Sequence, residues 1–292
     1  MTALRASPPI LPAGTFYGTS LRRLPELPFA WVELDESERS PVPLHVHAAA
    51  HVCFLVSGAY HAESAAGVVG SPTVLFHPAG TRHRDRFLSE RGRCLTLSFE
   101  GAWLAELFER TLPARSTALA LPEVVASAFR VLCLGRRGQD DSPALVEGAT
   151  IELLARFAPR SFATGRSAPP WIGRAQGFLR ENHARPLRVP EVAAEVGVHP
   201  VVLARGFRRF LGCAPLEFLR QVRAGEAARR LGASRSLAEL ALSTGHADQP
   251  QFTKSFRRAI GITPGRLRDE LEPAAGSRRT RRHGSTSTRW RA

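Results

Sequence analysis

The sequence of 292 residues has no long apolar run and no closely spaced pair of cysteines. No stretch of about 18 apolar residues occurs, so a membrane-spanning helix is not expected. The start of the chain is interrupted by Pro8, Pro9 and Pro12 and lacks the apolar core of a signal peptide. The four cysteines form no C-x-x-C motif, which is typical of reduced thiols in the cytoplasm. We therefore expect a cytoplasmic protein.

Lysine is almost missing, and arginine carries nearly all of the positive charge. Lys254 is the one lysine among 40 basic residues, and the formal net charge is +14. Residues 1–170 carry 17 Arg and 16 acidic residues, whereas residues 171–271 have a net charge of +8 and residues 272–292 one of +5. The length predicts two domains. A near-neutral part followed by a basic part favours a polyanionic partner for the C-terminal part alone.

One sequence pattern occurs twice in this basic part. Residues 207–215 read FRRFLGCAP, and residues 256–264 read FRRAIGITP. An Ala-x-x-x-Gly pattern precedes each copy, at residues 193–197 and 241–245. The repetition predicts one structural unit that is present twice.

Each copy predicts a helix, a short turn and a second helix. In the first copy Val189 and Val196 lie on one helical face, and Gly197 ends the helix because glycine adopts the left-handed conformation at low cost. In the second copy Ser236 and Asp248 are expected N-caps, since each has Glu or Gln three residues later.

The second helix of each copy has an outward-facing side with side chains suited to DNA. Its members are Val201, Arg205 and Arg208 in the first copy and Gln249, Thr253, Lys254 and Arg257 in the second. Arginine fits guanine O6 and N7 with two hydrogen bonds, and glutamine fits adenine in the same way. A helix-turn-helix presents its second helix to the major groove, so two such faces favour DNA binding over a merely solvated surface.

The duplicated segment resembles the DNA-binding domain of the AraC/XylS family of transcription regulators. The matching residues are Ala193, Gly197, Leu203, Arg205, Phe207, Gly212, Arg223, Ala227, Ala241, Gly245, Phe252, Phe256, Gly261, Thr263, Pro264 and Arg268. The resemblance implies a domain over residues 171–271, with two helix-turn-helix units joined by a long helix at about residues 215–231. One departure is His246, which stands where the family usually has an aromatic or large apolar residue.

The same resemblance implies partners. They are double-stranded DNA, a small-molecule effector, a second copy of the chain in a homodimer, and RNA polymerase as a contact of an activator. The sequence itself leaves the direction of regulation open.

The N-terminal half predicts short strands separated by glycine turns. The clearest strands are Phe29–Leu34, His51–Ser57, Thr73–Phe76 and Cys94–Phe99. Such strands suggest a small β-barrel or sandwich. Residues 1–28 are expected to be an N-terminal arm, and residues 29–158 an effector-binding domain. Amphipathic helices between residues 101 and 158 either pair two subunits or cover their own barrel.

Histidines stand in two short motifs of this half. The pattern H-x-H-x-x-x-H at residues 45–51 and the pattern P-x-G-x-x-H at residues 78–83 resemble the two cupin motifs, with His51 replacing the usual Glu. The resemblance implies four candidate side chains, which are His45, His47, His51 and His83. They are candidate ligands of a divalent transition metal, because imidazole suits such ions. An organic effector held by the same residues is the favoured alternative, because barrel mouths commonly hold ligand pockets. His77 is expected to be a local polar residue outside the motif.

The expected fold class is therefore α+β. It comprises an N-terminal cupin-like β-barrel with following helices and a C-terminal all-α domain with two helix-turn-helix units. Residues 159–170 are rich in Pro and Gly and predict a linker, and residues 272–292 predict a disordered basic tail.

Three functions compete. The leading hypothesis is an effector-responsive, sequence-specific transcription regulator that is not an enzyme. The second is a metal-dependent cupin sensor or cupin enzyme fused to a DNA-binding domain; as an enzyme it lacks the carboxylate that His51 replaces. The third is a nonspecific architectural DNA binder, which two different recognition faces disfavour.

Overall fold

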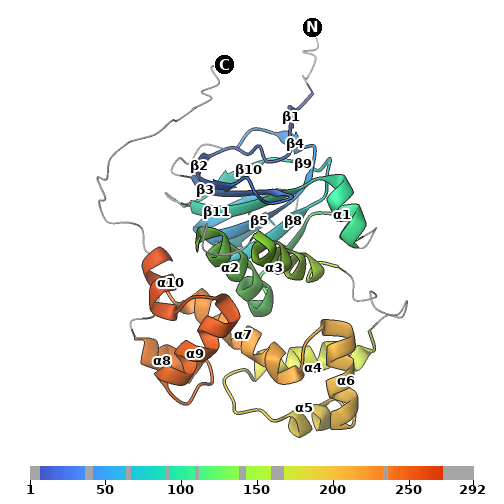
Figure 1. Ribbon diagram of the computed structural model, residues 1–292, viewed down its shortest axis with the longest axis vertical. Helices are drawn as coiled ribbons and strands as arrows, with labels where there is room; N and C mark the ends of the chain where they lie inside the picture. Colours follow the sequence, from blue (N-terminus) through green and yellow to red (C-terminus); the bar gives the residue numbers. More distant parts are fainter. Residues whose placement is uncertain are drawn as a thin grey trace.

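The computed structural model describes residues 7–36, 42–63, 67–89, 92–108, 112–137, 143–158, 168–232, 234 and 236–271. Strands dominate the N-terminal half, and the part after residue 168 is helical (Figure 1). The α+β class is thereby confirmed. Most of the predicted linker and the whole predicted basic tail lie outside the described residues. Within the described segments, no helix is both long and apolar enough to cross a membrane.

Among the described residues, the N-terminal half contains twelve strands. They are β1 Ile10–Leu11, β2 Thr19–Leu24, β3 Ala30–Glu36, β4 His45–His47, β5 Ala50–Ser57, β6 Ala59–Ala62, β7 Gly67–Gly70, β8 Thr73–His77, β9 Arg82–His83, β10 Asp85–Phe87, β11 Gly92–Phe99 and β12 Thr117–Leu119. The four strands that the sequence predicted most clearly are all present, as β3, β5, β8 and β11. The segment expected as an N-terminal arm contributes β1, which pairs with β4, and β2, which pairs with β3.

The strands form three sheets, and the largest has the order β12-β8-β5-β11-β3-β2. The other two have the orders β1-β4-β9 and β10-β6-β7. The described strands therefore do not close into a barrel, and the expected cupin-like barrel is not confirmed. The short strands β4, β9 and β10 pair within small sheets of their own, so no ladder joins the outer strands β2 and β12 of the large sheet.

The central strands β5, β8 and β11 of the large sheet are buried on both faces, which explains their nearly continuous apolar sequences. Alternate residues of a strand point to opposite faces. On β5, Phe54 therefore packs toward the helices, whereas Leu55 packs toward the β10-β6-β7 sheet in a separate cluster. His51 and Cys53 share the face of Leu55, and this face borders the histidine site described below.

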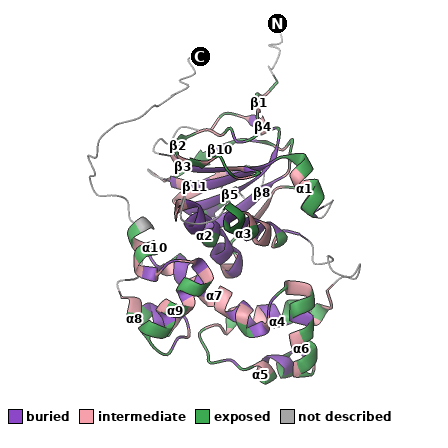
Figure 2. Ribbon diagram, viewed as in Figure 1, coloured by how far each residue is buried: buried purple, intermediate pink, exposed green. Residues whose placement is uncertain are grey.

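The described residues of this half also form three helices, α1 Gly101–Phe108 before β12, and α2 Pro122–Arg137 and α3 Pro143–Ala155 after it. Helix α2 lies under the large sheet and is buried along most of its length (Figure 2). Phe129 of α2 meets Phe54 edge to face, with ring centroids 4.9 Å apart. At Gly135 the helix approaches the Trp31 indole so closely that any added Cβ would overlap it. Helix α2 therefore covers the sheet of its own chain.

The C-terminal part contains seven helices among its described residues. They are α4 Pro170–Glu181, α5 Val189–Glu195, α6 Pro200–Leu211, α7 Pro215–Arg230, α8 Leu237–Ser243, α9 Gln249–Ile260 and α10 Pro264–Leu271. The predicted turn and cap residues have the expected roles. Gly197 has φ 72°, the Ser236 hydroxyl accepts from the backbone N–H groups of residues 238 and 239, and the Asp248 carboxylate accepts from that of Gln251.

The two helix-turn-helix units are built on different cores. The first unit, α5 and α6 with α4, has its own core around Leu203, Phe207 and Phe218. The core of the second unit, α8 and α9 with α10, is continuous with that of α2 and the large sheet and includes Phe252 and Phe256. Helix α7 joins the units and lies alongside α2 (Figure 1).

Candidate nucleic-acid interface and histidine cluster

The outer face of α6 is exposed as the sequence predicted. Val201 is 49% exposed, and Arg205 and Arg208 are also exposed, whereas Leu203 and Phe207 on the inner face are fully buried. His199 caps the helix by accepting from the backbone N–H of Val201. The first unit therefore exposes two arginines on the outer face of α6, while the inner face of this helix packs into the apolar core.

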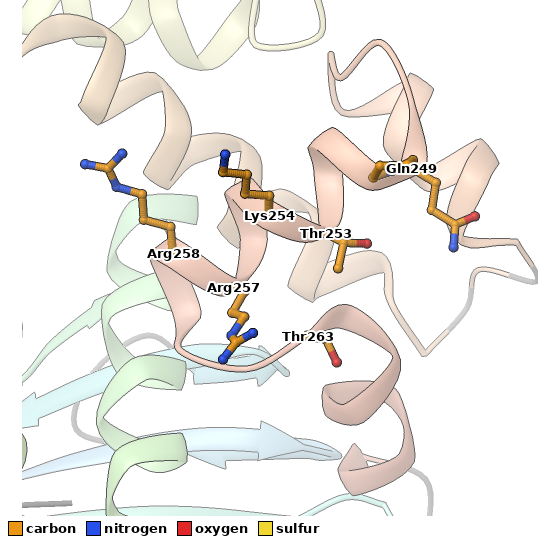
Figure 3. A pocket seen from close by; sticks show the side chains of 7 residues that line it. Gln249, Thr253, Lys254, Arg257, Arg258 and Thr263 are labelled. Atoms are coloured by element: carbon orange, nitrogen blue, oxygen red, sulfur yellow. The ribbon is translucent and has the colours of Figure 1, made fainter.

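The outer face of α9 forms an open hollow of about 890 Å³ with three positive charges on its border. Gln249, Pro250, Thr253, Lys254, Arg257, Arg258 and Thr263 line it. Figure 3 shows these side chains projecting from α9 and from the turn that follows it. All of the predicted residues of the second unit lie here, and Arg258 joins them. Since none of these lining residues is acidic, the surface suits a phosphate backbone.

Arg208 lines a cavity beside the N-terminal half, and Arg205 does not. This cavity of about 640 Å³ lies between α6, the start of α7 and helices α2 and α3, and Glu123 and Glu152 also border it. The predicted contact of Arg208 with DNA phosphate stays a prediction.

His246 takes the place of an aromatic residue under the second turn. It is 6% exposed and meets Phe252 edge to face, with ring centroids 5.3 Å apart. Its Nδ1 lies 3.2 Å from the Thr244 hydroxyl. Burial, with the nearby Arg223 charge, lowers the pKa of His246 to about 4, so the ring is neutral at pH 7 and packs as an aromatic side chain.

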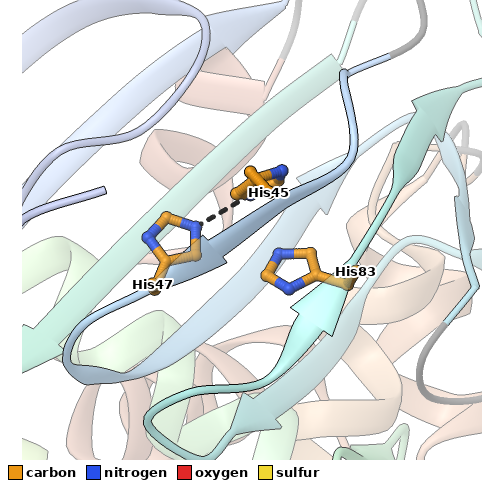
Figure 4. A group of neighbouring side chains, drawn as sticks. All are labelled: His45, His47 and His83. Atoms are coloured by element: carbon orange, nitrogen blue, oxygen red, sulfur yellow. Dashed lines mark hydrogen bonds between the residues drawn. The ribbon is translucent and has the colours of Figure 1, made fainter. Parts of the chain in front are cut away.

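Three of the predicted histidines meet at the paired strands β4 and β9. His45 lies opposite His83 in the strand register, and one ring nitrogen from each of His45, His47 and His83 falls within 4.8 Å of the others. The Nε2 atoms of His45 and His47 are 3.0 Å apart (Figure 4). The sequence therefore identified three side chains that could hold one ion together.

His51 and His77 extend this group from the large sheet. They face each other on β5 and β8, with ring centroids 4.8 Å apart, and His77 lies 5.0 Å from His83 by the same measure. None of the five histidines is more than 5% exposed. The expectation that His77 is a local polar residue is wrong, because β8 pairs with β5 and points it into the cluster. We call His45, His47, His51, His77 and His83, together with Asp85, the histidine cluster.

Asp85 is the acidic member, and sequence reasoning missed it. Its Oδ2 lies 3.3 Å from Nε2 of His83, and its Oδ1 is buried without a hydrogen-bond partner among the described residues. Burial raises the pKa of Asp85 to about 6, although a hydrogen bond from Tyr60 opposes the shift. Its position two residues after His83, which puts it on the same side of an extended chain, was the available signal.

Burial keeps these imidazoles neutral at pH 7. Desolvation lowers the pKa of His47 and of His77 to about 3, and each histidine is disfavoured further as a cation by its histidine neighbours. Desolvation also lowers the pKa values of His45, His51 and His83. A neutral imidazole has a free ring lone pair, which is the form that binds metal.

The cavity inside the cluster is small, about 60 Å³. Phe16 and Tyr17 from the N-terminal segment cover it, with Phe16 at 5.0 Å from the ring of His47 and Tyr17 at 5.1 Å from that of His45. Pockets for drug-sized ligands measure roughly 300–1,000 Å³, whereas one water occupies about 30 Å³ of liquid. In this structure the cavity has room for an ion and a few small ligands.

Comparison with known proteins decides the nature of the C-terminal part. Residues 192–270 match a helix-turn-helix domain family. A putative AraC-like transcription regulator of Streptomyces antibioticus is 33% identical over 107 residues, which are 36% of this chain and 35% of that protein. The C-terminal part is a DNA-binding domain of the AraC type.

Other known proteins are also similar to this chain. The transcriptional regulator ArgR of Pseudomonas aeruginosa is 29% identical over 105 residues, 36% of this chain and 32% of that protein. Among solved structures, ToxT of Vibrio cholerae O395 covers 84% of this chain and 99% of its own, at 10% identity and a TM-score of 0.37. The chain matches only about a third of the length of these two curated relatives.

The AraC-type domain is tied to the N-terminal half by polar contacts at both units. At the first unit, Arg180 of α4 donates from Nε to Glu123 of α2 at 3.1 Å and also binds this carboxylate through Nη2. At the second unit, Arg137 of α2 donates to the carbonyl oxygen of Gly261, the C-cap of α9. Helix α2 therefore contacts both units of the domain.

Proposed function

We propose that the protein is a sequence-specific transcription regulator of the AraC/XylS type whose N-terminal half binds a small effector. The observation that carries the proposal is the pair of exposed recognition faces on α6 and α9, within a domain whose relatives are named transcription regulators. The effector site is the histidine cluster, in a cupin-like arrangement of strands. The proposed role is regulatory and not enzymatic.

A homodimer and a contact with RNA polymerase belong to the same proposal. Leu107 on α1 is 41% exposed and Leu145 on α3 is 52% exposed. We assign these two exposed leucines to the subunit contact of the proposed homodimer.

Footprinting with the full-length protein tests the proposal. Two recognition helices from one chain are expected to enter successive major grooves about 10 base pairs apart, so each subunit should protect an asymmetric site of about 17–20 base pairs. Affinity should fall steeply with salt, because each neutralised phosphate releases counterions. Equal affinity for the selected site and for random DNA would instead identify an architectural binder.

The Arg205→Ala variant should lose base reading at one place in the operator. We expect the free energy of binding to the best site to weaken by about 1–3 kcal/mol, and the base preference to relax at one or two adjacent base pairs. Arg208→Ala is the matched variant one helical turn away. If the Arg208 guanidinium contacts phosphate, this variant should bind all DNA sequences more weakly by the same factor. Selection from randomised operators measures both. An unchanged base preference in the Arg205 variant would contradict the assignment.

A further inference from the structure

The histidine cluster contains features that an organic pocket does not need. Hydrogen bonds to backbone carbonyls fix the rings of two histidines. Nδ1 of His45 lies 2.7 Å from the oxygen of Pro43, and Nδ1 of His83 lies 3.2 Å from that of Thr81. A neutral imidazole that donates from Nδ1 has its lone pair on Nε2. The chain therefore fixes the tautomers with both Nε2 lone pairs available, which is the usual support for histidines that bind metal.

These lone pairs face other polar atoms of the cluster. Nε2 of His45 faces Nε2 of His47 at 3.0 Å, and Nε2 of His83 faces Oδ2 of Asp85 at 3.3 Å. The Oδ1 atom of Asp85, in a residue only 4% exposed, has no hydrogen-bond partner among the described residues. The His47 ring can donate its Nε2–H to His45, whereas Oδ1 of Asp85 has no donor among the described residues, and a buried acceptor without a donor is costly. A cation held by the imidazoles and this carboxylate satisfies it.

We infer that the histidine cluster binds one divalent transition-metal ion, and that this ion is the effector of the regulator proposed above. The three nearest ligands are His45, His47 and His83, and Asp85 supplies the negative charge that a set of neutral imidazoles lacks. His51 and His77 supply the other two imidazole rings that line the cavity. Imidazole ligands select zinc, nickel, cobalt, copper or iron over calcium and magnesium, which prefer oxygen ligands.

The size of the cavity supports an ion over an organic molecule. A volume of about 60 Å³, covered by Phe16 and Tyr17, is well below the roughly 300–1,000 Å³ of drug-sized pockets.

The strands that bear the cluster also contact the helices beneath the sheet. On β8, His77 belongs to the cluster, and the adjacent Phe76 packs against Phe157 in the turn after α3, with ring centroids 5.8 Å apart. On β5, His51 belongs to the cluster, and Phe54 packs against Phe129 of α2. Metal binding therefore acts on strands that pack directly against α2, and α2 contacts both units of the AraC-type domain. The regulatory part of this inference rests on the proposed function.

The test uses full-length protein purified without a polyhistidine tag and stripped with a chelator. Titration with zinc, nickel or cobalt salts, followed by calorimetry and by the cobalt absorption spectrum, should give one bound equivalent. His47→Ala and Asp85→Asn should each weaken binding by about 10-fold to 100-fold or more. His83→Gln, which keeps the size of the side chain, guards against loss of folding. The half-exposed His61 lies on β6 outside the cluster, and His61→Ala should bind as the wild type does.

The same samples are then titrated with operator DNA with and without the metal. A change in operator affinity of about fivefold or more is expected, and His47→Ala should abolish the change. Failure of every metal to bind more tightly to the wild type than to His47→Ala would overturn the metal site, while intact operator recognition would leave the proposed function standing. Metal binding with unchanged operator affinity would overturn the ion's role as effector. Metal binding without any sequence preference for DNA would refute the proposed function instead.

Discussion

Replacing Gly225 by alanine should undock the AraC-type domain from the N-terminal half. Gly225 lies in α7, and a Cβ at this position would overlap the backbone of Pro122 at the start of α2. Backbone cannot rotate away as a side chain can, so the two helices must separate. We expect the free energy of unfolding to fall by about 3 kcal/mol, which is the upper end of the range for an overpacked core. Thermal unfolding and small-angle scattering of the full-length protein measure it.

A matched control separates this overlap from helix propensity. Gly173 lies in α4 with nothing within 4 Å of an added Cβ. Gly173→Ala should stabilise the protein by up to about 1 kcal/mol, because alanine favours a helix over glycine. Equal effects of the two substitutions would show that α7 and α2 are not closely packed in solution.

Arg180→Ala should destabilise the same interface from the first unit. The substitution leaves the Glu123 carboxylate, whose side chain is 3% exposed, without its bidentate partner. Removing one partner of a buried pair costs about 3–5 kcal/mol, because the remaining charge stays buried. We expect about 3 kcal/mol, since the Arg180 side chain keeps 22% exposure. Urea unfolding of the full-length variant gives the value.

The chain provides an exposed ion pair as the comparison. Arg185 binds Glu191 with side-chain exposures of 57% and 39%, and Arg185→Ala should cost no more than about 1 kcal/mol. Adding Glu123→Ala to the Arg180 variant should recover more than half of the loss, because no unpaired charge then remains. If the double variant is as unstable as the single one, the loss reflects packing and not charge.

The AraC-type domain could be predicted from the sequence because its signals are local. Helix caps such as Ser236 and Asp248, the turn at Gly197 and the apolar spacing each act within a few residues. Repetition of the unit then confirmed the pattern within a single chain.

The histidine cluster could be predicted only in part, because it depends on strand register. His45, His47, His51 and His83 were accessible through motif spacing. His77 joins them because β8 pairs with β5 at His51, and no local signal gives that register. That the described strands do not close into a barrel likewise depends on which strands pair, and alternating side chains cannot show this.

The sequence of α2 indicates that this helix packs against more than the sheet. The run from Val124 to Gly135 is apolar on nearly every side, with Arg130 as its exposed exception. A helix of this kind is expected to be buried all round. The sequence of α2 thus predicts that a second group of residues covers the side of the helix that faces away from the sheet. It does not indicate that the AraC-type domain provides this group.

Helix α2 also determines where this protein can be divided or recombined. Its core is continuous with the second unit at Phe252 and Phe256, so the boundary between sensing and DNA binding lies along a helix packed on both sides. A chimera joined between residues 158 and 168 would separate α2 from the α7 that fits it at Gly225. Exchange of specificity between regulators of this architecture therefore requires that α2 be transferred together with the DNA-binding domain, although the two are separated in the sequence.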